Sequence, residues 1–384
     1  MSDRPEPDRA ARDEIERTLL DWMEEDAPAT DPERFERLAL ALFRFQFAAC
    51  PAYARLCLSL DRTPDEVERV EEIPPVPTGA FKEFALRCFP EADTAKIFRT
   101  SGTSVDRRGE LHLDTLVLYE ASLLASLRRS FLPGLVGSAP EMRFLAPSPE
   151  EAPDSSLTHM FEILRRAEGD PASGYDLRDG HLDLAALEHA ADRARRDDRP
   201  LVIAGTSFAF VHFLDDPKTE GEGRWQLPVG SRVMETGGFK GRSRSVPRDV
   251  LRSDIARRFG IDERAVVNQY GMTELGSQFY DSTLVDPDGP RRKQGPPWAR
   301  VRFVDPESGL DVAPGEVGMI VIHDLANTGS IAAIQTADLG RAIRDEAGHE
   351  IGFDVIGREE GAEARGCSIA TDVMLEASRQ EAGP

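Results

Sequence analysis

The sequence lacks any long hydrophobic segment. A helix that crosses a bilayer needs about 20 consecutive apolar residues, and a secretory signal needs an apolar core close to its first residues. Neither pattern occurs, since the segment 1–7 is polar and carries acidic side chains. We therefore expect a cytoplasmic protein without a membrane span.

Metal-binding and disulfide patterns are also missing. The 4 cysteines and 7 histidines do not stand at the spacing of a zinc or iron–sulfur site. A chain of 384 residues can bury a core without disulfide staples. Cys50, Cys57 and Cys88 lie among apolar residues and are expected to be small core residues, whereas Cys367 stands next to a glycine and near an arginine.

Positive charge, and lysine above all, is scarce. Acidic residues number 69 against 47 lysines and arginines, which gives a formal net charge of −22. Such a surface repels phosphate backbones and anionic lipids, so we expect no nucleic-acid or membrane partner. A nucleotide site in this chain would need local help from a metal ion, from backbone N–H groups or from a few arginines.

The first part of the chain, residues 1–98, is predicted to be a helical segment packed on the core. Apolar residues recur at helical spacing in the segments 15–23 and 35–43. Asp31 suits the N-cap of the second helix, and Pro32 suits its first turn.

Residues 99–298 are predicted to form an α/β core, and residues 299–384 a small β-rich subdomain. The predicted strands of the core are 142–146, 201–204, 232–235 and 265–269, and its predicted helices are 116–131, 184–195 and 248–259. This alternation favours a mostly parallel sheet, whose ligands bind at loops leaving the carboxyl ends of the strands. Beyond residue 298, short apolar runs alternate with Asp, Gly and Pro turns.

Two loops carry groups suited to phosphate and metal chemistry. The loop 99–104 (RTSGTS) surrounds a glycine with hydroxyls, so its backbone N–H groups can wrap phosphate oxygens. The loop 269–274 (QYGMTE) follows a predicted strand and can stack a base, contact a phosphate and ligate Mg²⁺. Taken singly, the first pattern is more often a plain turn, and the second also fits a strand-to-helix junction.

A third segment, 336–340 (TADLG), is interpreted as a turn and is followed by Gly357 and Arg358. A carboxylate such as Asp338 can accept hydrogen bonds from both ribose hydroxyls, with an arginine nearby. Taken alone, the first piece is more often a polar turn, and the second is more often a solvated arginine.

In this order, the three segments and the final arginine resemble the adenylate-forming superfamily, whose members activate acyl, aryl and amino acids. Four stretches are more closely similar to the acyl-protein synthetase (LuxE-like) family: 73–82, 98–104, 268–275 and 357–368. The resemblance implies the large-domain fold of that superfamily. It also implies activation of a carboxylic acid, expected to be fatty, to acyl-AMP with ATP and Mg²⁺, followed by acyl transfer to a cysteine thiol.

The resemblance also implies a role for each matching residue. ATP phosphates would be held by Thr100, Ser101, Gly102, Thr103 and Ser104, adenine by Tyr270 with Gly237 and Gly238 beside it, and ribose by Asp338. Thr273 would contact phosphate, Glu274 would ligate Mg²⁺, Arg358 would act from a hinge, and Cys367 would accept the acyl group.

Cys367 has two interpretations. Arg365 and Gly366 would favour an accessible thiolate, the nucleophile of thioester formation. The apolar run 367–370 suits a buried cysteine, which the residues alone favour, whereas the family resemblance favours the nucleophile. The final acceptor is correspondingly open: Cys367, a partner reductase, a carrier protein, coenzyme A or an amine.

The pattern departs from the superfamily in two places. Residues 105–108 (VDRR) follow the phosphate loop, where many members have a lysine. Only the segment 359–384 follows Arg358, so the large mobile C-terminal domain with its catalytic lysine is expected to be missing. A non-catalytic nucleotide- or acyl-binding module that keeps the fold is therefore the alternative from another functional class.

Overall fold

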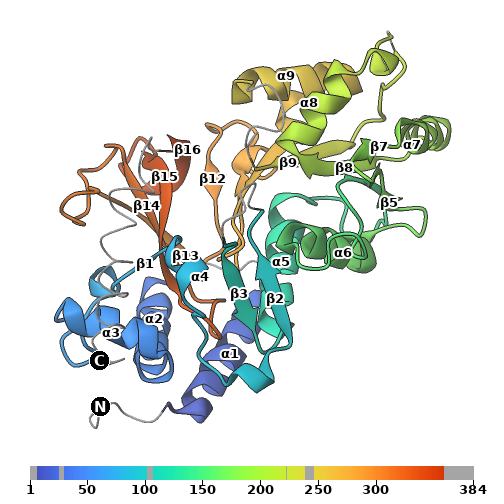
Figure 1. Ribbon diagram of the computed structural model, residues 1–384. Helices are drawn as coiled ribbons and strands as arrows, with labels where there is room; N and C mark the ends of the chain where they lie inside the picture. The colour runs from blue at the N-terminus through green and yellow to red at the C-terminus, as the bar shows by residue number, and fades with distance from the viewer. Residues whose placement is uncertain (1–6, 26–29, 102–106, 222, 238–245, 359–384) are drawn as a thin grey trace. The chain divides into compact units, whose positions relative to one another are not determined.

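The computed structural model describes residues 7–25, 30–101, 107–221, 223–237 and 246–358. It divides into two compact units, each assembled from separate parts of the chain (Figure 1). Unit 1 comprises residues 1–125, 272–277 and 294–384, and unit 2 comprises residues 126–271 and 278–293. Within the described ranges, no helix is both long and apolar enough to cross a membrane.

Each compact unit contains segments that are distant in the chain. The N-terminal helices and the C-terminal strands fall into the same unit. The sequence predicts a division into three consecutive segments, 1–98, 99–298 and 299–384. That division stays a prediction.

Unit 2 contains a mainly parallel sheet with the strand order β11-β10-β9-β8-β4-β5. The strands are β4 (Glu141–Leu145), β5 (Gly174–Tyr175), β8 (Leu201–Thr206), β9 (Arg232–Thr236), β10 (Val266–Tyr270) and β11 (Phe279–Asp281), of which β11 alone runs antiparallel to its neighbour. The helices are α6 (Ser156–Glu168), α7 (Leu184–Asp197), α8 (Ser207–Asp215) and α9 (Arg248–Phe259), and β6 (Leu177–Arg178) pairs with β7 (His181–Leu182). The α/β class predicted from the sequence is confirmed.

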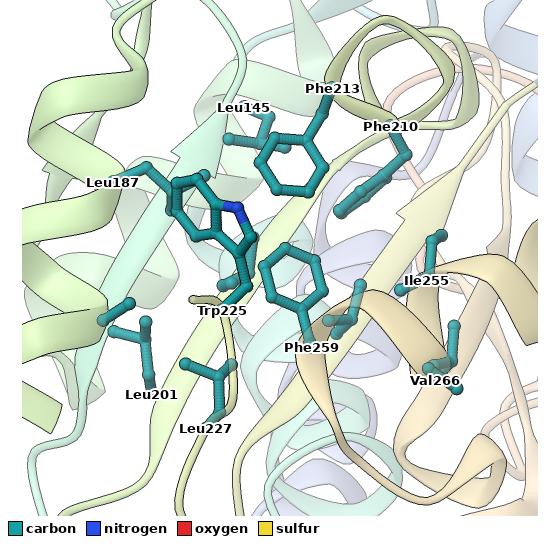
Figure 2. Close-up of a cluster of buried hydrophobic side chains, with 14 of the residues drawn as sticks. Leu145, Leu187, Leu201, Phe210, Phe213, Trp225, Leu227, Ile255, Phe259 and Val266 are labelled. Carbon is teal, nitrogen blue, oxygen red and sulfur yellow. The ribbon is translucent and has the colours of Figure 1, made fainter. Parts of the chain in front are cut away.

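Helices cover both faces of this sheet. Leu145 belongs to a buried cluster in which α7, α8 and α9 pack on the strands, with Phe213, Trp225 and Phe259 at its centre (Figure 2). The preceding residue, Phe144, instead stacks on a phenylalanine of α6 with ring centroids 4.9 Å apart. Because successive side chains of a strand point to opposite faces, α6 lies on the face away from the cluster.

Unit 1 combines N-terminal helices with an antiparallel sheet of order β13-β14-β15-β16. Its elements are α1 (Arg9–Met23), α2 (Pro32–Ala49), α3 (Pro51–Ser59), β1 (Val76–Pro77), α4 (Ala80–Glu83), β2 (Lys96–Arg99), β3 (Glu110–Leu113), β13 (Ala299–Val304), β14 (Gly318–Asp324), β15 (Ala333–Arg344) and β16 (Glu350–Arg358). Strand β1 pairs in parallel with β15, and β2 with β3 forms a hairpin. The helix α5 (Val117–Ser130) and the short strand β12 (Lys293–Gln294) each include residues of both units.

The predicted start of the second N-terminal helix and the predicted burial of three cysteines are confirmed. The Asp31 carboxylate accepts a hydrogen bond from the backbone N–H of Arg34, and Pro32 opens α2. Cys50, Cys57 and Cys88 are free thiols buried in the core. Cys367 lies outside the described residues.

The turn predicted at residues 336–340 is wrong. These residues belong to the long strand β15, which pairs with β14 on one side and β16 on the other. A Cβ atom on Gly340 would stand 2.6 Å from the carbonyl oxygen of Asp354, so this glycine serves the close approach of two strands. The bulge between Leu339 and Gly340 accommodates the glycine within the strand.

His323 makes the stability of unit 1 depend on pH. Burial, together with Arg302 and Arg300, lowers the pKa of this histidine to about 3. An unfolded histidine titrates near 6.5, so between these two values the unfolded chain binds a proton that the folded chain does not. The free energy of unfolding therefore falls as the pH drops below about 6.5.

We expect His323→Leu to reduce the loss of stability between about pH 7 and pH 5 by about 2 kcal/mol. Urea denaturation at several pH values measures this change. Ile322→Val, which changes the neighbouring buried residue of β14 and removes no titratable group, should leave the pH dependence as in the parent protein. If the free energy of unfolding of His323→Leu changed with pH as in the parent protein, the role given to His323 would be contradicted.

Candidate active site

The ends of the first phosphate-loop candidate are held together by hydrogen bonds. Thr100 N–H donates to the carbonyl oxygen of Gly109 over 2.9 Å, and Gly109 N–H donates to Thr100 Oγ1 over 2.9 Å. Arg108 Nε donates to the carbonyl oxygen of Thr100 over 2.6 Å. The β2–β3 hairpin thus brings the two ends of the loop side by side, with Ser101 exposed. Gly102, Thr103 and Ser104 lie outside the described residues.

Glu274 reaches the base of this loop from a distant part of the chain. A Cβ atom on Gly109 would stand 3.1 Å from Thr100 Cγ2 and 3.6 Å from Glu274 Oε1. The Glu274 side chain is buried, and the half-buried Thr273 precedes it in the same turn. Thr100 and Glu274 therefore both border the space next to Gly109 that a Cβ atom would occupy.

Asp338 and Arg358 are also brought together within unit 1. They are register partners of β15 and β16, and Arg358 Nε donates to Asp338 Oδ1 over 3.1 Å. The Asp338 side chain is 14% exposed and that of Arg358 is 66% exposed, so the arginine reaches out from the pair. The backbone N–H of Asp338 donates to Thr336 Oγ1 over 3.0 Å and fixes the start of this segment.

Gly237 and Tyr270 occupy neighbouring strand ends in unit 2. The residues that precede them, Thr236 and Gln269, are register partners at the carboxyl ends of the parallel strands β9 and β10. Gly237 is exposed and has a φ of +79°, which favours glycine. The half-buried ring of Tyr270 tilts against Phe279 with centroids 6.1 Å apart. Gly238 lies outside the described residues.

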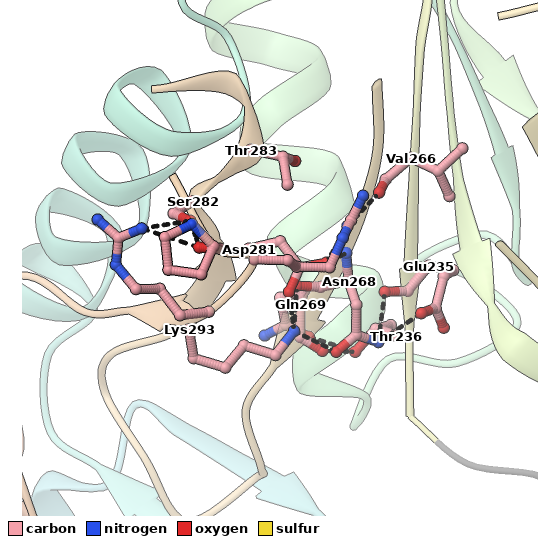
Figure 3. A network of polar contacts seen from close by, with 12 residues as sticks. Glu235, Thr236, Val266, Asn268, Gln269, Asp281, Ser282, Thr283 and Lys293 are labelled. Atoms are coloured by element: carbon pink, nitrogen blue, oxygen red, sulfur yellow. Dashed lines mark hydrogen bonds and ion pairs between the residues drawn. The ribbon is translucent and has the colours of Figure 1, made fainter. Parts of the chain in front are cut away.

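Beneath these strand ends lies a buried network of polar groups that the sequence did not predict (Figure 3). Lys293 Nζ donates to Asp281 Oδ1 over 2.8 Å and to the carbonyl oxygen of Asn268 over 2.7 Å. Asn268 Nδ2 donates to Glu235 Oε1 over 2.6 Å. Ser207 Oγ lies within hydrogen-bonding distance of the Glu235 carboxylate and of the carbonyl oxygen of Gly237. The network thus connects the β9 end with the β10 end.

The charges of this network are set by burial. Burial lowers the pKa of Lys293 and raises the pKa of Glu235. Burial would also raise the pKa of Asp281, but the positive charges of Lys293 and Arg291 outweigh it and lower that pKa. Lys293 and Asp281 form an ion pair within the core, and the scarcity of lysine in the chain is the signal that could have drawn attention to Lys293.

The donor set around Glu274 fits a magnesium ion that arrives with a nucleotide. Among the residues described by the structure, no group of three or more His, Cys, Asp or Glu side chains could hold a metal ion. Mg²⁺ is usually bound by one or two carboxylates together with substrate phosphates, and not by a cage of protein groups. One buried carboxylate next to a phosphate-loop candidate matches that pattern.

The structure therefore assembles the candidate residues in parts. Unit 1 brings Thr100 next to Glu274 and Asp338 next to Arg358, and unit 2 brings Gly237 close to Tyr270 in register. The expectation that all of them surround one nucleotide stays a prediction.

Two kinds of comparison place the chain among known sequences. The family model described as acyl-protein synthetase, LuxE, matches residues 181–377, just over half of the chain. The long-chain-fatty-acid–luciferin-component ligase of Aliivibrio fischeri is 22% identical over 342 residues, which cover 87% of this chain and 87% of that protein. The ligase of the same name from Vibrio harveyi is 20% identical over 342 residues, covering 87% and 86%.

Solved structures support the fold. An open conformation of 2-hydroxyisobutyryl-CoA ligase, in complex with 2-HIB-AMP and CoA, has a TM-score of 0.60 at 13% identity and covers 88% of this chain and 80% of that chain. The postadenylation state of the same ligase with R3-HIB-AMP has a TM-score of 0.58 at 15% identity, with coverages of 88% and 72%. At these identities the likeness shows a shared fold, and the predicted adenylate-forming fold is confirmed.

Gly109→Ala tests the space between Thr100 and Glu274. The added methyl group would press on Thr100 Cγ2 at 3.1 Å and approach Glu274 Oε1 at 3.6 Å. We expect binding of Mg²⁺–nucleotide to weaken about tenfold, the cost of crowding a well-packed site, as measured by isothermal titration calorimetry with a non-hydrolysable ATP analogue.

Gly174→Ala is the matched control for this change. Its methyl group would stand 3.3 Å from Arg143 Nη1 in unit 2, a similar degree of crowding. Equal nucleotide affinities for the two variants would argue against a phosphate site at Gly109.

Proposed function

Because the chain belongs to the acyl-protein synthetase LuxE family, we propose that it activates a carboxylic acid with ATP and passes the acyl group to a protein thiol. The names of the two ligase relatives support a long-chain fatty acid as the substrate. The observation that carries the proposal is that Thr100 and Glu274 border the same space next to Gly109. A reaction that consumes ATP also fits the cytoplasmic location expected from the sequence.

In the first step, the residues of unit 1 bind the triphosphate. The loop 100–104 presents backbone N–H groups and hydroxyls to the phosphate oxygens, and Thr273 adds a hydroxyl next to Glu274. Glu274 would hold Mg²⁺, and that ion would supply neutralisation of charge on the phosphates. A carboxylate oxygen of the acid attacks the α-phosphorus, the bond to the bridging oxygen of pyrophosphate breaks, and pyrophosphate leaves.

Nucleoside recognition is proposed for four further residues. Tyr270 stacks on adenine beside Gly237, since both stand at carboxyl ends of parallel strands, where ligands of such sheets bind. Asp338 accepts hydrogen bonds from the ribose hydroxyls. Arg358, which already contacts Asp338 Oδ1, holds that carboxylate in place.

In the second step, a thiolate takes the acyl group. The sulfur attacks the acyl carbonyl carbon, the bond from that carbon to the phosphate oxygen of AMP breaks, and AMP leaves while the thiol proton passes to solvent. Cys367 is the proposed nucleophile. An acyl-accepting reductase is the proposed partner that receives the group afterwards.

Exchange of labelled pyrophosphate into ATP tests the first step. We expect exchange that depends on the added acid, with long-chain fatty acids among the best in a panel. Glu274→Ala should lower the exchange rate about 100-fold or more, because it removes charge stabilisation at the phosphates. Glu346→Ala, which removes an exposed carboxylate of the same unit, should leave the rate unchanged.

The acceptor is tested with labelled acid in the same reaction. Label on the protein that hydroxylamine removes, and that Cys367→Ser lacks, supports the acyl-protein synthetase. Label that never reaches the protein while acyl-CoA, an acyl carrier protein or an amide accumulates identifies another ligase chemistry. A protein that shows no exchange with any acid is a binding module, and the proposal fails.

A further inference from the structure

The turn that carries Glu274 is held from outside by the segment 324–332. We propose that Asn327, itself held by Gln46, is a positioning residue for Glu274 and so sets where Mg²⁺–nucleotide is bound. This inference rests on the proposed function, because it takes Glu274 as the carboxylate that holds the metal.

Asn327 ties the Glu274 backbone to a second turn. Its Nδ2 donates to the carbonyl oxygen of Glu274 over 2.7 Å and to the carbonyl oxygen of Ile331 over 3.1 Å. Asn327 is 1% exposed, so water does not compete for these bonds. One amide group therefore fixes the peptide from which the Glu274 side chain extends.

Asp324 holds the other end of the same turn. Its Oδ2 accepts from the backbone N–H of Ser277 over 2.8 Å, and its Oδ1 accepts from Ser277 Oγ over 2.7 Å. A Cβ atom on Gly276 would stand 3.1 Å from Ala326 Cβ, so the two turns touch along their backbones. The turn 274–277 is thus attached at its first and last residues.

The segment 324–332 is in turn fastened to the N-terminal helices. Gln46 of α2 donates from Nε2 to the carbonyl oxygen of Asn327 over 2.9 Å and accepts at Oε1 from Ala332 N–H over 3.0 Å. Thr328 Oγ1 donates to Glu16 of α1 over 2.6 Å. All of these residues belong to unit 1, so the helices support the Glu274 turn from behind.

This arrangement matters because Mg²⁺ tolerates little departure from octahedral geometry. A ligand carboxylate has to be held within about 0.5 Å of its productive position. The turn 272–277 belongs to no helix or strand, and the backbone hydrogen bond within it, from Leu275 N–H to the carbonyl oxygen of Met272, is long at 3.3 Å. Asn327 and Asp324 supply it through contacts made far away in the sequence.

Asn327→Asp tests the inference with almost no change in size. The substitution replaces an N–H donor by an acceptor that faces two carbonyl oxygens, so the Glu274 peptide loses its attachment. We expect the dissociation constant of Mn²⁺ in the complex with a non-hydrolysable ATP analogue to rise about tenfold. Electron paramagnetic resonance measures free Mn²⁺ directly, and nucleotide binding in EDTA should change less than twofold.

Two further variants complete the design. Gln46→Met removes the outer attachment and should weaken Mn²⁺ binding in the same direction but less. Tyr53→Phe removes a buried hydrogen bond of 2.9 Å to the carbonyl oxygen of Pro74 in the same unit, and should leave Mn²⁺ binding unchanged. If Asn327→Asp does not fold, the comparison of Gln46→Met with Tyr53→Phe decides.

The possible outcomes separate this inference from the proposed function. Parent-like Mn²⁺ affinity in the folded variants, while the parent binds Mn²⁺–nucleotide and catalyses exchange, overturns the positioning role alone. Equal weakening in Tyr53→Phe also overturns it, since general loosening of unit 1 would then be the cause. A parent protein that neither binds Mn²⁺–nucleotide nor exchanges pyrophosphate overturns both.

Discussion

A carboxylate in an irregular turn has to be held by groups outside that turn. Glu274 stands between β10 and β11 in such a segment, and the described contacts that fix it come from residues some fifty positions further along the chain. A buried amide or carboxylate that holds a loop costs free energy unless its polar atoms are hydrogen-bonded. The Asp324 carboxylate accepts hydrogen bonds from backbone N–H groups and a hydroxyl, although burial still raises the pKa of its carboxyl group.

In unit 2, charged side chains hold the ends of the strands in place. The strand ends that present Gly237 and Tyr270 are joined by Glu235, Asn268 and Lys293, and Lys293 is balanced by Asp281. Removing one partner of a buried ion pair usually costs about 3–5 kcal/mol, whereas the intact pair adds little stability by itself. Such a pair is therefore better understood as a device that fixes the spacing of two strands than as a source of stability.

The parts of the fold that the sequence predicted are those set by neighbouring residues. The helix α9 has the predicted bounds 248–259, and Asp31 caps α2, because periodicity and capping act within a few residues. The turn predicted around Asp338 was wrong because pairing on both sides of β15 outweighs the turn preference of its Asp and Gly residues. Gln46, Asn327 and Lys293 were not singled out, since their partners are fixed only by the tertiary fold. The approach of Thr100 to Glu274 could be expected only from the resemblance to a family.

The charge of the chain bears on how a triphosphate is neutralised. Among the described residues next to the motifs, Arg108 donates to the carbonyl oxygens of Thr100 and Arg99, and Arg358 donates to Asp338. These arginines therefore hold protein groups in place. With a net charge of −22, the protein surface adds no general attraction for a nucleotide. We infer that binding depends on backbone N–H groups of the phosphate loop and on a metal ion that accompanies the nucleotide. The position of Glu274, and hence the contacts that fix its turn, then becomes the most sensitive part of the site.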